Sequence, residues 1–196
     1  MNMPISFLNS FPRLTALTLL LVLVLGFSFS PLRPDAWAAL LPLFEWMEGN
    51  GFGVIGRTWG AAFAVVEALH LLAMALLGGA IVISDGRLLG FLLRDIPIQT
   101  VLSNTDRLFT IGLLMAIASG LFMACGVALK IYYLPVYWFK MLALAAGVLF
   151  TFTIKRPLLA DGIEELNPWL VRAVAVASLM VWFTVAATGR WIGFSG

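Results

Sequence analysis

The side chains best suited to chemistry in this sequence are Glu67 and His70, which lie in the middle of a long apolar segment. His70 is the only histidine of the 196 residues. Residues three positions apart share one face of a helix, and an ionisable group at membrane depth costs about 3 kcal/mol or more. Because an imidazole titrates near neutral pH and a carboxyl group can orient it, the pair predicts proton-coupled binding of a ligand. The alternative is a buried, purely structural hydrogen bond.

Two basic side chains are candidates for the same site. Lys140 lies early in the apolar segment 136–154, and Arg190 follows the apolar segment 170–188. We therefore predict an outward-facing polar pocket with Glu67 and His70 at its base and Lys140 or Arg190 near its mouth. The alternative is that both cations extend along their alkyl chains to the membrane surface.

Three redox or metal groups fit side chains of these types. His70, Met74 and Cys125 combine an imidazole with soft sulfur, the ligands that copper(I) prefers, although Met and Cys are also ordinary packing residues. Haem b is a second candidate, with His70 as an axial ligand, and a quinone is a third. A di-iron centre is excluded, because its bundle motif needs Glu-x-x-His twice.

The sequence lacks the spacings typical of hydrolases and ATP-driven enzymes, such as a Ser/His/Asp order, a phosphate loop or a zinc-protease motif. Its 12 Lys and Arg residues are scattered, which excludes a nucleic-acid footprint. We therefore predict no catalytic residues, and a protein that binds a ligand or a redox group, haem b or quinone, rather than an enzyme. A copper-handling permease and a structural or accessory subunit of a membrane complex stand as alternatives.

The elements that must position these side chains are membrane-spanning helices. The sequence is 62% hydrophobic and 11% charged, and its mean hydropathy is +1.02, whereas a soluble domain is about 45–50% apolar and about 25% charged. A span needs about 20 mostly apolar residues, and the segments of that kind are 14–30, 58–84, 108–129, 136–154 and 170–188. We predict an all-α polytopic transmembrane helix bundle.

This bundle divides into two parts. Residues 1–38 form an N-terminal hydrophobic segment, either an anchor helix or a cleaved signal, and residues 39–196 form a core of four spans. Segment 39–56 is too short to span and predicts a short interfacial helix. In the loop 86–107, the leucines before Pro97 predict a second short surface helix, and Asp85 is expected to pair with Arg87 or to anchor the end of its helix.

One span carries small residues at every fourth position, namely Gly112, Ala116, Gly120 and Ala124. This spacing places them on one helix face, where a neighbouring backbone approaches closely. The stripe predicts a tight helix pair and no chemistry.

The basic residues near the ends of the spans favour an orientation with the loop 86–107 on the inside. We therefore expect a multi-pass protein of the bacterial cytoplasmic (inner) membrane. Its expected partners are the lipid bilayer and either a second copy of the chain or a periplasmic or membrane redox partner, and nucleic acid is not among them.

Four stretches together resemble a known family. They are residues 66–72 (Val-Glu-Ala-Leu-His-Leu-Leu), 85–90 (Asp-Gly-Arg-Leu-Leu-Gly), 137–140 (Tyr-Trp-Phe-Lys) and 189–192 (Gly-Arg-Trp-Ile). The sequence resembles a bacterial integral-membrane family of unknown function, domain of unknown function family 6644, over residues 43–194. Members usually have Asp-Leu-Arg where this chain has residues 85–87, and the first hydrophobic segment looks like an addition to the family core. The resemblance implies a four-helix core and no established activity.

Overall fold

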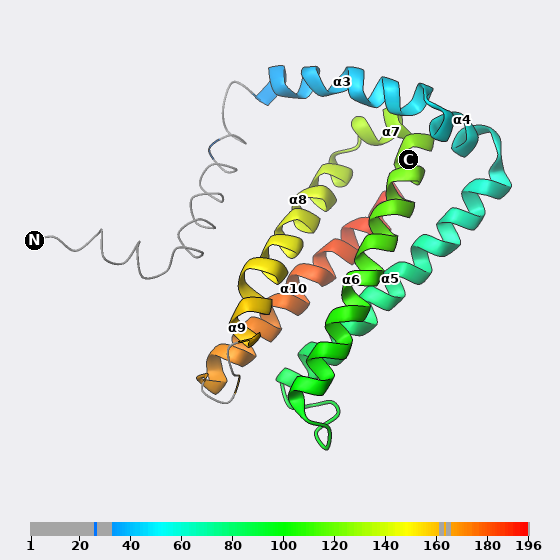
Figure 1. The fold of residues 1–196 in the computed structure, drawn as a ribbon. Coiled ribbons are helices and arrows are strands. Elements are labelled where there is room, and N and C mark those ends of the chain that lie inside the picture. Colours follow the sequence, from blue (N-terminus) through cyan, green and yellow to red (C-terminus); the bar gives the residue numbers. More distant parts are fainter. Residues whose placement is uncertain (1–25, 27–32, 161–162, 164–165, 196) are drawn as a thin grey trace, which may run out of the picture.

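The computed structural model describes residues 26, 33–160, 163 and 166–195. The predicted hydrophobic segment 14–30 therefore lies outside the described residues, except for residue 26. Throughout the described residues the regular secondary structure is helical, without strands. Long helical segments stand side by side, and shorter helices lie across one end of them (Figure 1).

Four of the predicted spans are present as long apolar helices among the described residues. They are α5 (Gly60–Leu88), α6 (Ile98–Gly126), the continuous run of α8, η1 and α9 (Pro135–Ala160), and α10 (Pro168–Ile192). The shortest has 25 residues, which at 1.5 Å per residue gives about 37 Å, more than the roughly 30 Å of a bilayer core. The chain is therefore a multi-pass membrane protein, as its hydropathy predicts.

The third of these segments changes its helical geometry along its length. It begins as α8 (Pro135–Leu149), passes through the π-helix η1 (Phe150–Lys155) and ends as α9 (Arg156–Ala160). Proline stands in the first turn of α8 and of α10, where its missing N–H has no helical acceptor to lose. A π-turn inside an α-helix is rare and frequently lies at a functional site.

Three shorter helices cover one end of the bundle, which we call the α3 end. They are α3 (Arg33–Gly49), α4 (Gly51–Thr58) and α7 (Ala128–Tyr132). The predicted single helix over 39–56 is thus two helices, because Asn50 caps α4 by accepting from the backbone N–H of Gly53 at 3.0 Å. Glu48 fastens this layer to the bundle, since its carboxylate accepts from the N–H of Leu129 at 2.7 Å.

Aromatic side chains fill the space beneath α3. The ring of Phe44 lies 5.3 Å from that of Tyr132, and the ring of Trp37 lies 4.4 Å from that of Trp138. The hydroxyl of Tyr132 donates to the carbonyl of Trp37 at 2.8 Å, and burial raises the pKa of Tyr132 above its ordinary value. This aromatic layer holds α3 against α7 and the start of α8.

The opposite end, which we call the α9 end, corrects one prediction. The short surface helix expected before Pro97 is absent, since residues 89–97 form turns between α5 and α6. Gly90 and Leu93 both have positive φ, 79° and 50°, which no right-handed helix contains. The turn is closed by backbone bonds, such as that from the N–H of Phe91 to the carbonyl of Gly86 at 2.8 Å, and by the side chain of Arg87, which donates to the carbonyl of Ile96 at 3.0 Å.

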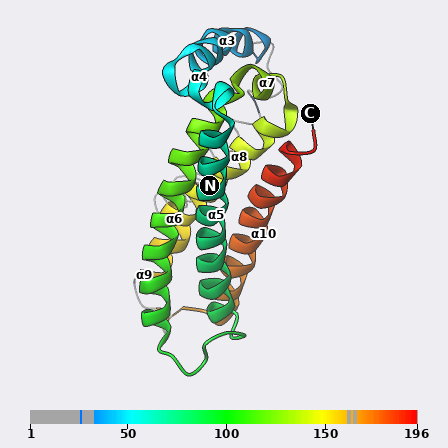
Figure 2. The same ribbon diagram turned by 90° about the vertical axis from the view of Figure 1, so that its right-hand side faces the viewer.

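Close packing of α5 on α6 defines the centre of the bundle. α5 lies between α6 and α10, and α8 packs on α10 (Figure 2). A Cβ added at Gly112 would stand 3.0 Å from the backbone nitrogen of Leu77, so glycine is needed there for the two backbones to approach. At Gly120 the same test meets the imidazole of His70 at 3.1 Å. The predicted stripe of small residues therefore faces α5 at these two positions.

Candidate functional site

The first candidate site is a pocket of about 430 Å³ between α5, α6, α8 and α10, which we call the central pocket. Its walls are apolar except for a few side chains, and Met47 of α3 contributes to the wall as well. The polar side chains that line it are His70, Tyr137, Lys140 and Trp182. An apolar cavity with a few convergent polar groups is the usual form of a small-molecule site.

His70 reaches the central pocket in a defined orientation. Its Nδ1 lies 2.9 Å from the hydroxyl oxygen of Ser119, and that hydroxyl donates its own proton to the carbonyl of Met115 at 2.6 Å. The serine has one proton, so with that proton directed to Met115 we assign Nδ1 of the imidazole as the donor to Ser119, beside the backbone of Ala116. In the neutral ring Nε2 then carries the lone pair, and it has no protein partner among the described residues.

Lys140 brings a second polar group to the same pocket. A Cβ added at Gly189 would lie 3.5 Å from Nζ of Lys140, so the lysine chain crosses α10 where that helix has no side chain. Lys140 is half-buried, and within the described part of the chain its ammonium group has no hydrogen-bond acceptor or carboxylate partner. Even a partly buried charge gains from a partner, so this ammonium group is available to a ligand.

Two of the predicted site residues lie elsewhere. Glu67 is exposed on the outside of α5 and does not line the central pocket. Positions three apart are about 60° apart around a helix, and α6 covers the side of α5 that bears His70. Arg190 is also exposed, and its guanidinium lies 4.4 Å above the ring of Phe194. The structure therefore brings together His70 and Lys140, and leaves Glu67 and Arg190 outside.

The sulfur-containing candidates are divided in the same way. Met74 lines the central pocket with His70, as do Met47 and Met141. Cys125 does not line the pocket, because it is buried in the cluster with Phe44 and Tyr132 beneath α3. Among the described residues, no group of three or more His, Cys, Asp and Glu side chains is arranged to hold a metal. A metal in the central pocket would therefore rely on His70 and methionine sulfur.

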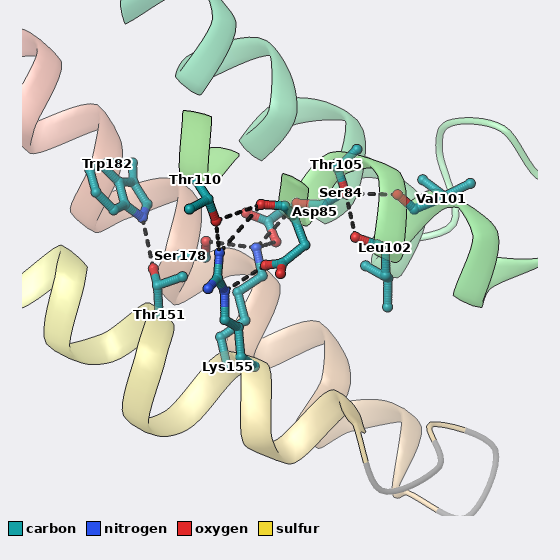
Figure 3. Close-up of polar contacts among 12 residues, drawn as sticks. Ser84, Asp85, Val101, Leu102, Thr105, Thr110, Thr151, Lys155, Ser178 and Trp182 are labelled. Atoms are coloured by element: carbon teal, nitrogen blue, oxygen red, sulfur yellow. Dashed lines mark hydrogen bonds and ion pairs between the residues drawn. The ribbon is translucent and has the colours of Figure 1, made fainter. Parts of the chain in front are cut away.

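The second candidate site is a buried ion pair toward the α9 end (Figure 3). Oδ1 of Asp85 on α5 lies 2.5 Å from Nζ of Lys155 on η1. The two side chains are 0% and 10% exposed. Nζ also donates to the hydroxyl oxygens of Ser84 and Ser178 at 3.2 Å each. Asp85 thus pairs across the bundle rather than with Arg87, its expected neighbour.

The π-helix η1 places two polar side chains toward the bundle interior. One is Lys155, and the other is Thr151, whose hydroxyl oxygen accepts from Nε1 of Trp182 at 3.2 Å. The two residues are four positions apart and therefore share one helix face, where Lys155 contacts Ser84 of α5 and both residues contact α10. η1 therefore builds the link between the ion pair and Trp182, which lines the central pocket.

A second cavity, of about 280 Å³, lies beside the ion pair, and we call it the polar pocket. Its polar lining consists of Ser84, Gln99, Ser103, Thr105, Asp106, Thr151, Lys155 and Arg156. Arg156 is held there by Asp106, with 2.5 Å between Nε and Oδ1, and by the hydroxyl of Thr110 at 2.6 Å. Gln99, Ser103 and Asp106 are exposed, so the polar pocket extends to the protein surface.

Comparison with known proteins gives one match. The family model described as "Family of unknown function (DUF6644)" matches residues 43–195. The chain belongs to this family. No curated protein and no solved structure matches it. The DUF6644 match includes all the residues that line the two pockets. It confirms the resemblance seen in the sequence without adding an activity.

The ion pair of this DUF6644 protein was not predicted from its sequence. Asp85 and Lys155 end two different apolar segments, 70 positions apart. The available signal was their charge, since opposite charges at the ends of segments that finish on the same side of the membrane can meet. The presence of Ser84 beside Asp85 strengthens that signal, because a hydroxyl supplies a further acceptor for the lysine.

Proposed function

We propose that this protein binds a membrane-dissolved quinone-type ligand in the central pocket, and does so in the bacterial inner membrane. The observation that carries the proposal is the pair of unpartnered polar groups, Nε2 of His70 and the ammonium group of Lys140, in an otherwise apolar cavity. A ligand with an apolar body and two separated oxygen atoms satisfies both groups without placing a further charge in the membrane.

The chemistry of the two groups supports a ligand that gains and loses protons. The ammonium group of Lys140 donates hydrogen bonds and stabilises a carbonyl or an oxyanion. Neutral His70 accepts a proton at Nε2, while protonated His70 donates from the same atom. One oxygen of the ligand therefore accepts from Lys140. The other contacts Nε2 of His70, which accepts a hydrogen bond when that oxygen is protonated and donates one when it is not. Proton-coupled binding, predicted from Glu67 and His70, is thus assigned to His70 and Lys140.

A metal-containing group is the second candidate, and the contact of His70 with Ser119 favours it. Metal-bound histidines almost always donate their other ring N–H to an acceptor, which fixes the tautomer, and Ser119 accepts from Nδ1 in this way. Met74 and Met141 line the same cavity. His70 with a methionine would hold either copper(I) or a haem b iron.

The test is the ligand content of the full chain purified into lipid nanodiscs. Extracted quinone is measured by chromatography, and iron and copper are measured by elemental analysis, for the wild type, His70→Ala and Lys140→Met. Lys130→Met is the matched control, because Lys130 is exposed and lines neither pocket.

We expect near-stoichiometric quinone in the wild type and Lys130→Met, and a loss of most of it in His70→Ala and Lys140→Met. Stoichiometric iron or copper that disappears in His70→Ala would replace the quinone proposal with the metal candidate. Absence of quinone, iron and copper from the wild type would contradict both and leave a structural or accessory subunit.

A further inference from the structure

In the ion pair toward the α9 end, every proton of the ammonium group has an acceptor, whereas one oxygen of the carboxylate lacks a hydrogen-bond donor. An ammonium group has three protons, and those of Lys155 are directed to Oδ1 of Asp85 and to the hydroxyl oxygens of Ser84 and Ser178. Oδ2 of Asp85 is buried and has no hydrogen-bond partner among the described residues, and the hydroxyl of Ser178 is the other donor close to the carboxylate. A buried carboxylate oxygen without a donor is destabilised, so this atom is a natural acceptor for a proton.

The polar pocket gives water a route to Lys155 and Ser84, which both adjoin Asp85, although Asp85 itself is not part of the pocket wall. Ser84 and Lys155 form part of the wall of the polar pocket, and the exposed residues Gln99, Ser103 and Asp106 form its opening to the surface. A volume of about 280 Å³ accommodates several water molecules, each of which occupies about 30 Å³. The wall offers hydroxyl, amide and carboxylate groups to such waters, whereas the central pocket offers mostly apolar atoms.

Among the described residues at this end, Lys155 is the charged side chain that pairs with Asp85. On α6 and α9, Asp106 and Arg156 pair with each other. On α5, Arg87 donates to carbonyls of the turn that follows. From α10, the uncharged Ser178 contacts Lys155. The remaining charged residues described at this end are exposed: Arg94, Asp95, Arg107 and Arg172.

We propose that Asp85 is a proton-binding site served by water in the polar pocket. In the uptake step, an O–H bond of a hydronium ion breaks, an O–H bond forms at Oδ2 of Asp85, and a water molecule is left. Lys155 keeps its three protons and its contacts with Ser84, Ser178 and Oδ1. The inference does not rest on a ligand in the central pocket, which Trp182 and Thr151 separate from the polar pocket.

Infrared spectroscopy of the full chain in lipid nanodiscs tests this inference. The carbonyl stretch of a protonated carboxylic acid is recorded against pH in H2O and in D2O, for the wild type and Asp85→Asn. Asp35→Asn is the matched control, because Asp35 is exposed on α3, far from this end of the bundle. We expect a pH-dependent band that is lost in Asp85→Asn, is kept in Asp35→Asn and shifts promptly in D2O.

A band that is equally strong in Asp85→Asn, the absence of any titrating band, or a band that D2O does not shift would each overturn the proposal. If Asp85→Asn does not fold, Lys155→Met serves instead. Removing the cation that stabilises the carboxylate should let the protonated band persist to higher pH, and an unchanged titration in that variant would contradict the proposal as well.

Discussion

At the scale of single residues, the contact between His70 and Ser119 decides what the central pocket can bind. Ser119 donates a hydrogen bond to the carbonyl of Met115 and accepts one from Nδ1 of His70, so it determines which ring nitrogen remains available. Neighbouring polar contacts of this type hold a ligand-binding imidazole in one tautomer and one orientation. The residue that positions the histidine is thus a serine on another helix.

Ser119→Ala should therefore weaken ligand binding while the fold is kept. A net hydrogen-bond contribution of about 0.5–1.5 kcal/mol corresponds to roughly 2- to 13-fold in affinity. The measurement is a quinone titration of the variant in nanodiscs, with Ser103→Ala as the control, since Ser103 is exposed and does not line the central pocket. Equal affinities in the two variants would show that Ser119 does not position His70.

The buried pair of Asp85 and Lys155 makes a separate prediction about stability. Removing one partner of a buried ion pair costs about 3–5 kcal/mol, because the other charge stays buried without a partner. Lys155→Met should lower the stability of the folded protein accordingly, and Asp85→Asn with Lys155→Met should restore part of it. Thermal unfolding in detergent measures both, and a double variant less stable than Lys155→Met would contradict this account of the pair.

At the scale of helices, the sequence predicted where the spans lie better than it predicted which helix faces are covered by neighbours. The four spans follow from long apolar runs, and the structure has them with longer ends. The spacing of Glu67 and His70 predicts a shared helix face, yet only His70 lines the pocket, because α6 covers one side of α5. Hydropathy does not reveal which side a neighbour covers.

Features made by pairs of distant segments were harder to predict. The turn over 89–97 depends on positive φ at Gly90 and Leu93 and on contacts from Arg87, where the leucines alone indicate a helix. The pair of Asp85 and Lys155 joins α5 to η1 across 70 positions, and no local pattern in the sequence indicates that contact. The stripe of small residues was predictable because its period belongs to one helix.

The glycines of α5 and α6 allow a matched test of their packing. Gly112→Ala places a methyl group 3.0 Å from a backbone nitrogen of α5, whereas Gly79→Ala meets nothing within 4 Å. We expect Gly112→Ala to lose about 1–3 kcal/mol of stability through overpacking. Gly79→Ala should be neutral or gain up to about 1 kcal/mol from helix propensity. Thermal unfolding of both variants is the measurement, and equal stabilities would contradict the close approach of α5 and α6.

At the scale of the whole molecule, two cavities of different character lie along one bundle. The central pocket is apolar with two unpartnered polar groups, and the polar pocket extends to the surface toward the α9 end. The hydrogen bond from Trp182 to Thr151 lies between them. If the bundle is oriented with the turn over 89–97 on the inside, as its basic residues predict, the polar pocket opens to the cytoplasm.

This orientation makes a labelling prediction. Cys125, the only native cysteine, is buried, so a cysteine introduced at an exposed position is the main target of a membrane-impermeant maleimide. Phe91→Cys should be labelled in inverted membrane vesicles and protected in intact spheroplasts. Lys130→Cys, toward the α3 end, should show the opposite pattern, and the reverse of both results would invert the topology.

The central claim is that His70 and Lys140 hold a quinone-type ligand in the central pocket, and an equilibrium titration tests it most directly. Quenching of tryptophan fluorescence by a short-chain quinone is measured in nanodiscs for the wild type, Lys140→Met and Lys130→Met. We predict saturable quenching that is much reduced in Trp182→Phe, because Trp182 lines the pocket. Lys140→Met should weaken binding at least about 10-fold, or about 1.4 kcal/mol, and Lys130→Met should not. Equal binding by the wild type and Lys140→Met, or quenching that does not saturate, would contradict the claim.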